Sequence, residues 1–250
     1  MNIDNLTIIS VVEHDRGLVD LMIKSVEQFT DPVPDFILCD NGDNGNLAER
    51  YAGKSNVMIV KNTPALSGGS NRHGDGLNKI FPLVKTTRTA IVETDCIVLR
   101  KGWDKLEFPT YKMLAAKKGE QAGQPFYHVC FIVFSTGLLK HGNGIDFRAG
   151  KDSTRGNRNY KLWEDVGWQI RDKVRTDQIK LLEFVDCKSG KGKLFGKDFQ
   201  SDEFWLDGKP VVAHFGRGSN IAGKAIRKGF EHPEKQLERW KETALKIIGG

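Results

Sequence analysis

The sequence predicts an α/β protein in which helices cover a mostly parallel sheet, and three observations support this prediction. Strand-like and helix-like segments alternate over the first hundred residues, as in chains of parallel strands joined by helical crossovers. Of the 250 residues, 39% are hydrophobic and 28% are charged, which is ordinary for a globular protein. The length suits one large domain or two closely packed halves, since single cores stop growing at roughly 250–300 residues.

The elements of the first half follow from local patterns. Residues 6–12 form a continuous run of β-branched and apolar side chains, which predicts a strand buried on both faces. Apolar residues at spacings of three and four predict a helix over 18–29, ended by Asp31-Pro32. Further expected elements are strands at 36–39, 57–60 and 89–92, a short helix at 47–51, and a loop rich in Gly, Ser and Asn over 62–76.

Beyond residue 100 the pattern is less regular. The apolar residues of 126–139 favour a strand, and the stretches 142–159 and 188–197 predict loops because they are rich in glycine and basic residues. Helices are expected at 163–174 and 234–248. The last helix is amphipathic, with one face made of Leu237, Trp240, Ala244, Leu245 and Ile248.

No apolar run approaches the roughly 20 residues that a bilayer-spanning helix needs. The start of the chain also lacks the basic region of a secretory signal. We therefore expect a cytoplasmic protein without a transmembrane segment. Cys39, Cys96, Cys130 and Cys187 lie far apart and form no CxxC pair, so the spacing indicates neither a zinc site nor a disulfide framework. They are expected to be reduced and mostly buried.

The positive charge is concentrated in the C-terminal part of the chain. Residues 1–145 hold 16 basic and 16 acidic residues, so residues 146–250 carry the whole net charge of +6. This distribution suits either an anionic partner or a solvated surface without a partner, because +6 lies in the normal range for solubility.

Several catalytic signatures are absent from the sequence. No GxGxxG follows the first predicted strand, which argues against a dinucleotide-binding fold. The stretch KSGKGKLFGKD at 188–198 misses the spacing of a phosphate-binding loop, and neither GxSxG nor HExxH occurs.

Glu93-Thr94-Asp95 directly follows a predicted buried strand, at the edge where open α/β sheets bind their ligands. Residues two apart in a strand point the same way, so both carboxylates can contribute to a site for Mg²⁺ or Mn²⁺. The alternative is a strand-end turn with solvated acids.

Two further positions hold candidate functional residues. Glu164-Asp165 opens the helix expected at 163–174, where acids also serve as caps. His214 ends a short apolar strand, and its alternative role is that of a hydrogen-bonded structural histidine.

In their order and spacing these segments resemble the GT-A fold glycosyltransferases, closest to family 2, over roughly residues 6–220. The resemblance is carried by ILCDNGD at 37–43, SGGSN at 67–71, the DXD-like triplet at 93–95, the Glu-Asp pair at 164–165 and His214. It implies the nucleotide-diphospho-sugar transferase fold, which is a Rossmann-like sheet with an acceptor-side extension and a C-terminal helix. One compact domain would comprise a donor half at 1–99, an acceptor and catalytic half at 100–222, and the C-terminal helix at 223–250.

The resemblance also implies a metal-dependent transfer of a hexosyl or pentosyl group, with inversion, from a nucleotide-diphosphate sugar to an acceptor hydroxyl. A UDP-sugar is the leading expectation for the donor. Asp95 would bind Mn²⁺ or Mg²⁺ together with Glu93 and His214, and Asp165 would act as the general base with Glu164 orienting it. The residues expected to bind the donor are Val12, Glu13, Asp40, Gly68, Gly69, Asn71, Arg72, Glu93, Thr94 and Asp95.

The basic excess falls on the implied acceptor side. The leading expectation for the acceptor is therefore a hydroxylated base in phage-type modified DNA, which would place the enzyme in a host cytoplasm. The expected DNA contacts are Arg155, Arg158, Lys191 and Lys193. One alternative is a cell-surface glycan or a lipid-linked acceptor, and an alternative of another class is a non-catalytic basic nucleic-acid-binding protein. No obligate protein partner is evident.

Overall fold

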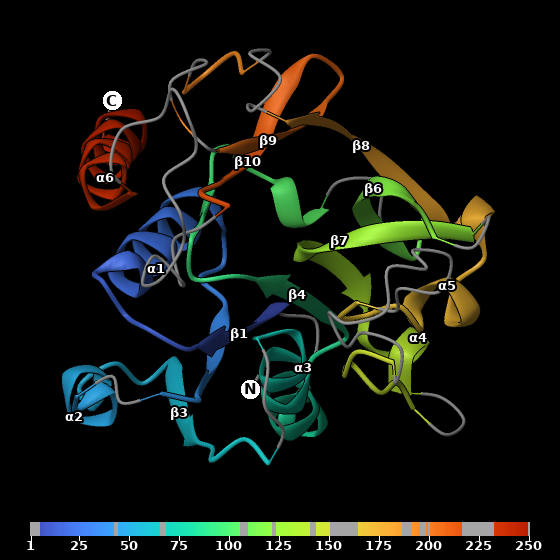
Figure 1. Ribbon diagram of the computed structural model, residues 1–250, viewed down its shortest axis with the longest axis horizontal. Coiled ribbons are helices and arrows are strands. Elements are labelled where there is room, and N and C mark those ends of the chain that lie inside the picture. The colour runs from blue at the N-terminus through green and yellow to red at the C-terminus, as the bar shows by residue number, and fades with distance from the viewer. Residues whose placement is uncertain are drawn as a thin grey trace.

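A computed structural model gives the three-dimensional structure of the chain. It describes residues 6–42, 45–65, 69–105, 110–121, 124–140, 144–150, 165–186, 192–195, 199, 201–216 and 233–249. These residues form one ten-stranded sheet with the strand order β3-β2-β1-β4-β7-β6-β8-β9-β10-β5, flanked by helices (Figure 1). The α/β fold predicted from the sequence is confirmed.

The first half of the chain alternates strands and helices as expected. Its elements are β1 (Leu6–Val12), α1 (Leu18–Phe29), β2 (Asp35–Asp40), α2 (Leu47–Tyr51), β3 (Val57–Lys61), α3 (Gly69–Ile80), the 3₁₀ turn Phe81–Leu83 and β4 (Arg88–Val92). β1 pairs with β2 and β4, and β2 pairs with β3, always in parallel. The chain thus builds the sheet outward from β1 in one direction and then returns to add β4 on the other side.

Both faces of β1 are covered, which explains its uninterrupted apolar sequence. Ile8 packs into one core cluster with Met22 of α1, and Ile9 packs into another with Leu77 of α3. The two helices therefore lie on opposite sides of this part of the sheet (Figure 1).

The second half is a mixed extension of the sheet. Its elements are β5 (Cys96–Val98), the 3₁₀ turn Trp103–Lys105, β6 (Met113–Gln121), β7 (Gln124–Ser135), α4 (Thr136–Lys140), α5 (Ile170–Lys173), the 3₁₀ turn Thr176–Gln178, β8 (Ile179–Asp186), β9 (Asp202–Leu206), β10 (Lys209–His214) and α6 (Pro233–Gly249). β7 pairs antiparallel with β4 and β6, while β6 and β8 are parallel. β5 pairs antiparallel with β10, so a segment just after β4 meets the end of a strand more than a hundred residues later.

Three expectations about the elements were wrong. α3 begins at Gly69, inside the expected loop 62–76. Of the helix expected at 163–174, the described part from residue 165 contains only α5 at 170–173, because Gly167 has φ 73°, which interrupts a right-handed helix. The apolar run 126–139 changes from β7 to α4 after Ser135. No element was expected over β6, whose sequence MLAAKKGEQ has the composition of a helix.

Close packing explains why α3 contains glycines that resemble a loop sequence. A Cβ added to Gly74 would lie 2.5 Å from the Cα of Arg148 and 2.6 Å from the carbonyl oxygen of Phe147. One added to Gly76 would lie 2.9 Å from the methyl carbons of Val11. The glycines therefore allow α3 to approach both β1 and the 147–148 segment.

We expect Gly74→Ala to lower the free energy of unfolding by about 1–3 kcal/mol, because the added methyl group overlaps backbone atoms that cannot move aside. Urea denaturation of the purified protein measures the change. Gly69→Ala is the matched control in the same helix, since no atom lies within 4 Å of its added Cβ. Equal stability of the two variants would contradict the close approach.

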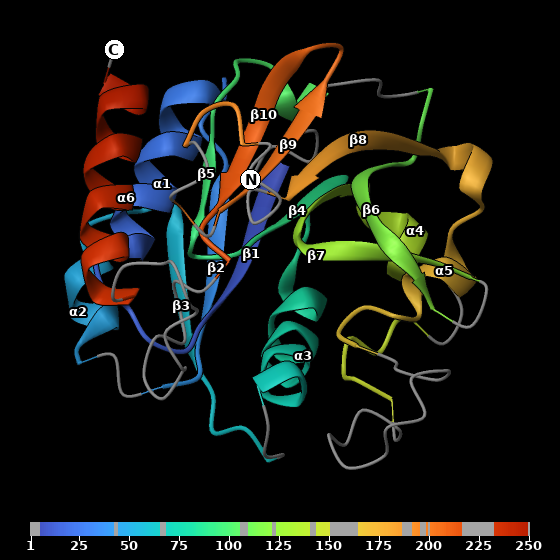
Figure 2. The same cartoon turned by 45° about the horizontal axis from the view of Figure 1, so that its top comes forward.

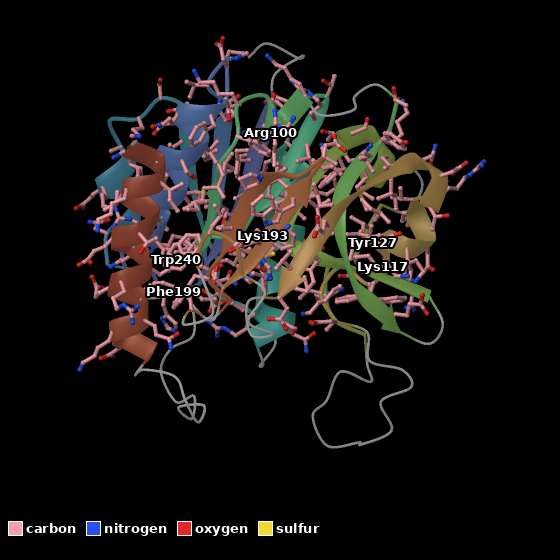
Figure 3. The ribbon with its side chains drawn as sticks, turned by 90° about the horizontal axis from the view of Figure 1, so that it is seen from above. Arg100, Lys117, Tyr127, Lys193, Phe199 and Trp240 are labelled. Atoms are coloured by element: carbon pink, nitrogen blue, oxygen red, sulfur yellow. The ribbon has the colours of Figure 1, made fainter. Side chains whose placement is uncertain are left out.

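The predicted C-terminal helix is confirmed as α6, which packs beside α1 (Figure 2). Four of its five predicted apolar contacts are buried, whereas Leu245 is 45% exposed and corrects the expectation for that position. Trp240 stacks on Phe195, with ring centroids 5.3 Å apart, and lies in the same core cluster as Phe199 (Figure 3).

Two other expectations concern cysteines and membranes. Cys39, Cys96 and Cys130 are buried and reduced, as expected, and Cys187 lies outside the described residues. Among the helices that the structure describes, none combines the length and the apolar character needed to cross a membrane.

Candidate active site

A cavity of about 620 Å³ opens at the carboxyl ends of β1 and β4. Glu13 and His14 follow β1 on its wall, and Glu93, Thr94 and Asp95 follow β4. These two strands are neighbours, yet the chain connects them only after building β2 and β3 on the far side. The cavity therefore lies at the topological switch point, where α/β sheets bind their ligands.

The first turn of α3 contributes a second wall of the cavity, through Gly69, Ser70, Arg72 and His73. Backbone N–H groups at a helix N-terminus attract anions, and the Arg72 guanidinium adds a positive charge. Lys118 of β6 also lines the cavity. This side of the cavity thus favours a negatively charged ligand.

Strand pairing gathers two acids and a histidine at the β4 end. Glu93 donates its backbone N–H to the carbonyl of Cys130 at 2.8 Å, and Cys96 donates to the carbonyl of Glu93 at 2.9 Å. The resulting tight turn leads from β4 into β5, where Cys96 lies opposite His214. Beyond that pair, the N–H of Phe215 donates to the carbonyl of Asp95 at 2.8 Å.

The three side chains predicted to hold a metal therefore meet. Nε2 of His214 lies 3.3 Å from Oδ1 of Asp95 and 3.6 Å from Oε2 of Glu93. One ligand atom from each residue lies within 4.8 Å of the other two. His214 and Asp95 are buried, and Glu93 is partly exposed.

The charges in this cluster depend strongly on one another. Burial raises the pKa of Glu93, but His214 and the nearby His73 and His128 outweigh it and lower that pKa to about 2. Burial raises the pKa of Asp95 above its usual value, although His214 opposes the shift. Burial lowers the pKa of His214, but the neighbouring Cys130, Asp95 and Asp202 raise it well above the usual value. The acidic groups of the cluster thus strongly stabilise a positive charge that lies among them.

Four residues near this cluster were missed by the sequence analysis: His73, His128, Cys130 and Asp202. Nδ1 of His73 lies 3.4 Å from Oε1 of Glu93. Oδ2 of Asp202 lies 3.4 Å from Nδ1 of His214 and 3.8 Å from Nε2 of His128. Burial raises the pKa of the Cys130 thiol, but Cys96, His128 and His214 lower it well below its usual range. For His128, Cys130 and Asp202 the only signal in the sequence was a polar side chain within or beside a strand, and His73 of α3 had no such signal.

Asp165, the predicted general base, lines the same cavity as the acidic triplet. Its Oδ1 accepts a hydrogen bond from the backbone N–H of Val166 at 2.8 Å, which holds the carboxylate in place. It lies in a turn rather than in the first turn of a helix. Glu164, its expected partner, lies outside the described residues.

The expected donor-binding residues divide into two groups. Glu13, Gly69, Arg72 and the triplet at 93–95 line the cavity. Nε and Nη2 of Arg72 donate to Oε2 of Glu13 at 3.1 and 2.9 Å, so these two side chains orient each other.

The second group does not appear in the cavity lining. The side chain of Val12 is in the core, and Lys61 donates to the buried Asp40 carboxylate at 2.5 Å. Asn71 is partly exposed on α3. Gly68 lies outside the described residues.

Lys193 is the one residue of the expected DNA contacts that falls within the described part of the chain (Figure 3). Its ammonium lies 4.6 Å from the ring centroid of Trp205 and 3.7 Å from Oε1 of Glu183. Arg155, Arg158 and Lys191 lie outside the described residues.

No family model matches the chain, and no curated protein matches it. It is similar to the mannosyltransferase PcManGT from Pyrobaculum calidifontis, in complex with GDP-Man and Mn²⁺, at 13% identity and a TM-score of 0.43, covering 56% of this chain and 47% of that one. Glucosyl-3-phosphoglycerate synthase from Mycobacterium tuberculosis matches at 13% identity and a TM-score of 0.40, covering 55% and 58%.

S. aureus TarS 1–349 in complex with UDP matches at 13% identity and a TM-score of 0.41, covering 54% of this chain and 48% of that one. The match thus spans about half of the length of these chains.

Proposed function

We propose that this protein is a metal-dependent glycosyltransferase that moves a sugar from a nucleotide-diphosphate sugar to an acceptor hydroxyl. The observation that carries the proposal is the meeting of His214 with Glu93 and Asp95, two acids that line a cavity at the switch point of the sheet. The same cavity holds a helix N-terminus, two cationic side chains and Asp165.

The donor set fits Mn²⁺ or Mg²⁺. Two carboxylates and one imidazole offer mostly hard oxygen ligands, and their ligand atoms lie within 4.8 Å of one another. A divalent cation bound there would neutralise the diphosphate leaving group.

The α3 side of the cavity would hold the phosphates. Backbone N–H groups of its first turn and the Lys118 ammonium would donate hydrogen bonds to the diphosphate and offset its negative charge. Arg72, oriented by Glu13, would contribute a fixed guanidinium. A UDP-sugar is the donor that we propose to test first.

Asp165 would act as the general base. As the acceptor oxygen attacks the anomeric carbon, its proton moves to the Asp165 carboxylate and the bond to the diphosphate breaks. One such step inverts the anomeric configuration. The hydrogen bond from Val166 would keep the carboxylate facing the cavity.

Release of nucleoside diphosphate from a panel of nucleotide sugars tests the proposal. We expect slow hydrolysis of one donor with Mn²⁺ and its loss after chelation with EDTA. The panel should contain UDP- and GDP-linked hexoses and pentoses. If no donor is hydrolysed in the presence of Mn²⁺ and no nucleoside diphosphate binds, the chain is not a glycosyltransferase, and a non-catalytic nucleic-acid-binding protein becomes the better hypothesis.

For the acceptor we propose a hydroxylated base in DNA, supported by the +6 charge carried by residues 146–250. Duplex binding should then weaken with salt by a log–log slope of roughly −0.9 for each neutralised phosphate. Lys193→Glu should make that slope shallower, whereas Lys24→Glu is the control, because Lys24 is an exposed residue of α1 outside the basic region. Absence of DNA binding at low salt would instead favour a glycan or lipid-linked acceptor.

A further inference from the structure

Two cysteines meet beside the predicted metal ligand His214. Cys96 lies on β5, directly opposite His214 of β10. The carbonyl of Cys130 on β7 accepts a hydrogen bond from the backbone N–H of Glu93 in the turn after β4. The Cys96 thiol donates to that same carbonyl at 3.4 Å. Cys96 is 0%, Cys130 1% and His214 6% exposed, so all three are buried.

The spacing of these three side chains suits a thiophilic cation. Their two sulfur atoms and an imidazole nitrogen lie within 4.8 Å of one another. A tetrahedral zinc ion has Zn–S and Zn–N distances of about 2.3 and 2.0 Å, which places neighbouring ligand atoms about 3.5 Å apart. Side-chain movements of about 1 Å would therefore close the site, with the fourth position left for water.

The site borders the cavity. Cys130 is one of the residues that line the 620 Å³ cavity. Sulfur ligands are soft and prefer Zn²⁺, whereas the oxygen atoms of Glu93 and Asp95 prefer Mn²⁺ or Mg²⁺. His214 belongs to both ligand sets.

We propose that Cys96, Cys130 and His214 form a second metal site that binds a thiophilic divalent cation such as Zn²⁺. Because His214 belongs to both ligand sets, Zn²⁺ bound to the two sulfur atoms would compete for the imidazole with a cation held by Glu93 and Asp95. Zinc is therefore an inhibitor that competes with the catalytic cation for His214. The sulfur site stands on its own geometry, and only the competition rests on the proposed function.

Co²⁺ added to the reduced, metal-free protein tests the sulfur site directly. We expect the near-ultraviolet charge-transfer bands of thiolate-bound Co²⁺ in the wild type and their loss in Cys96→Ala and Cys130→Ala. Cys39→Ala is the matched control, because Cys39 is also buried but belongs to none of the ligand sets found among the described residues. A wild-type spectrum without thiolate bands, or one that the Cys39 variant loses equally, would overturn the proposal.

Competition between the two cations is measured by electron paramagnetic resonance of Mn²⁺. We expect Zn²⁺ to release bound Mn²⁺ from the wild type. Zn²⁺ also binds ordinary oxygen and nitrogen sites more tightly than Mn²⁺ does, so release alone does not show that Zn²⁺ binds the cysteines. The cysteine variants distinguish direct replacement of Mn²⁺ from Zn²⁺ binding at the sulfur site. In them, the Zn²⁺ concentration for half release should rise at least about tenfold, since even partners of metal ligands contribute about 10–100-fold to affinity.

Serine variants provide a second comparison if an alanine variant folds poorly. Cys96→Ser and Cys130→Ser retain more volume and a polar atom, and either pair of variants gives the same comparison. An unchanged half-release concentration in folded variants would overturn the competition. Thiolate bands without any donor hydrolysis would support the zinc site while contradicting the proposed glycosyltransferase, so the two failures are distinguishable.

Discussion

Asp95→Asn should abolish sugar transfer and weaken Mn²⁺ binding more than about 100-fold, which exceeds the usual cost of losing a partner of a metal ligand. The reason is electrostatic. Asparagine keeps the shape of the side chain but removes a negative charge that lies buried 3.3 Å from Nε2 of His214. Calorimetric titration with Mn²⁺, and with nucleoside diphosphate in the presence of Mn²⁺, measures both losses.

Asp207→Asn is the matched control for this change. Asp207 lies in the exposed turn between β9 and β10 with φ 51°, a conformation that asparagine also adopts readily. It should bind Mn²⁺ as the wild type does. If Asp95→Asn, folded by circular dichroism, bound Mn²⁺ and nucleotide as tightly as the wild type, Asp95 would not be a metal ligand.

Asp165→Asn should reduce the turnover number by about 10²–10⁴-fold, because the variant cannot take up the proton of the acceptor hydroxyl. Binding of Mn²⁺ and of the donor should change little, since Asp165 belongs to none of the metal-ligand sets that the described residues form. Steady-state kinetics with a saturating donor separates the two effects. Asp172→Asn on α5 is the control, because the side chain of Asp172 is 60% exposed.

The stereochemistry of the product tests the same assignment independently. A single displacement assisted by one base inverts the configuration of the anomeric carbon, which NMR of the fresh product shows. A product that retains the donor's configuration would remove the role proposed for Asp165, even if the variant were inactive.

Much of the fold of residues 1–99 was predictable because its signals are local. The β-branched run of β1 and the apolar spacing of α1 depend only on neighbouring residues, and the structure contains both. The acids at 93 and 95 were also predictable, since they directly follow a recognisable buried strand. The sequence therefore determined the parallel core and the edge of the sheet at which the cavity lies.

Local sequence patterns indicated the wrong secondary structure where tertiary packing determines the conformation. Glycines in α3 indicate a loop, but they are needed because Gly74 and Gly76 touch neighbouring segments. β6 has a helical composition and becomes a strand because β7 and β8 pair with it on both sides. In each case contacts with residues distant in sequence outweigh the intrinsic preference of the segment.

Only the tertiary structure decided which side chains meet around His214. From their spacing alone, the cysteines gave no indication of a zinc site, because no two of them are close in sequence. The antiparallel pairing of β5 with β10 places Cys96 opposite His214, and the hydrogen bond from Glu93 to the carbonyl of Cys130 brings β7 to the same point. Strand pairing joins residues separated by a hundred positions or more, and no local pattern records which partners will pair.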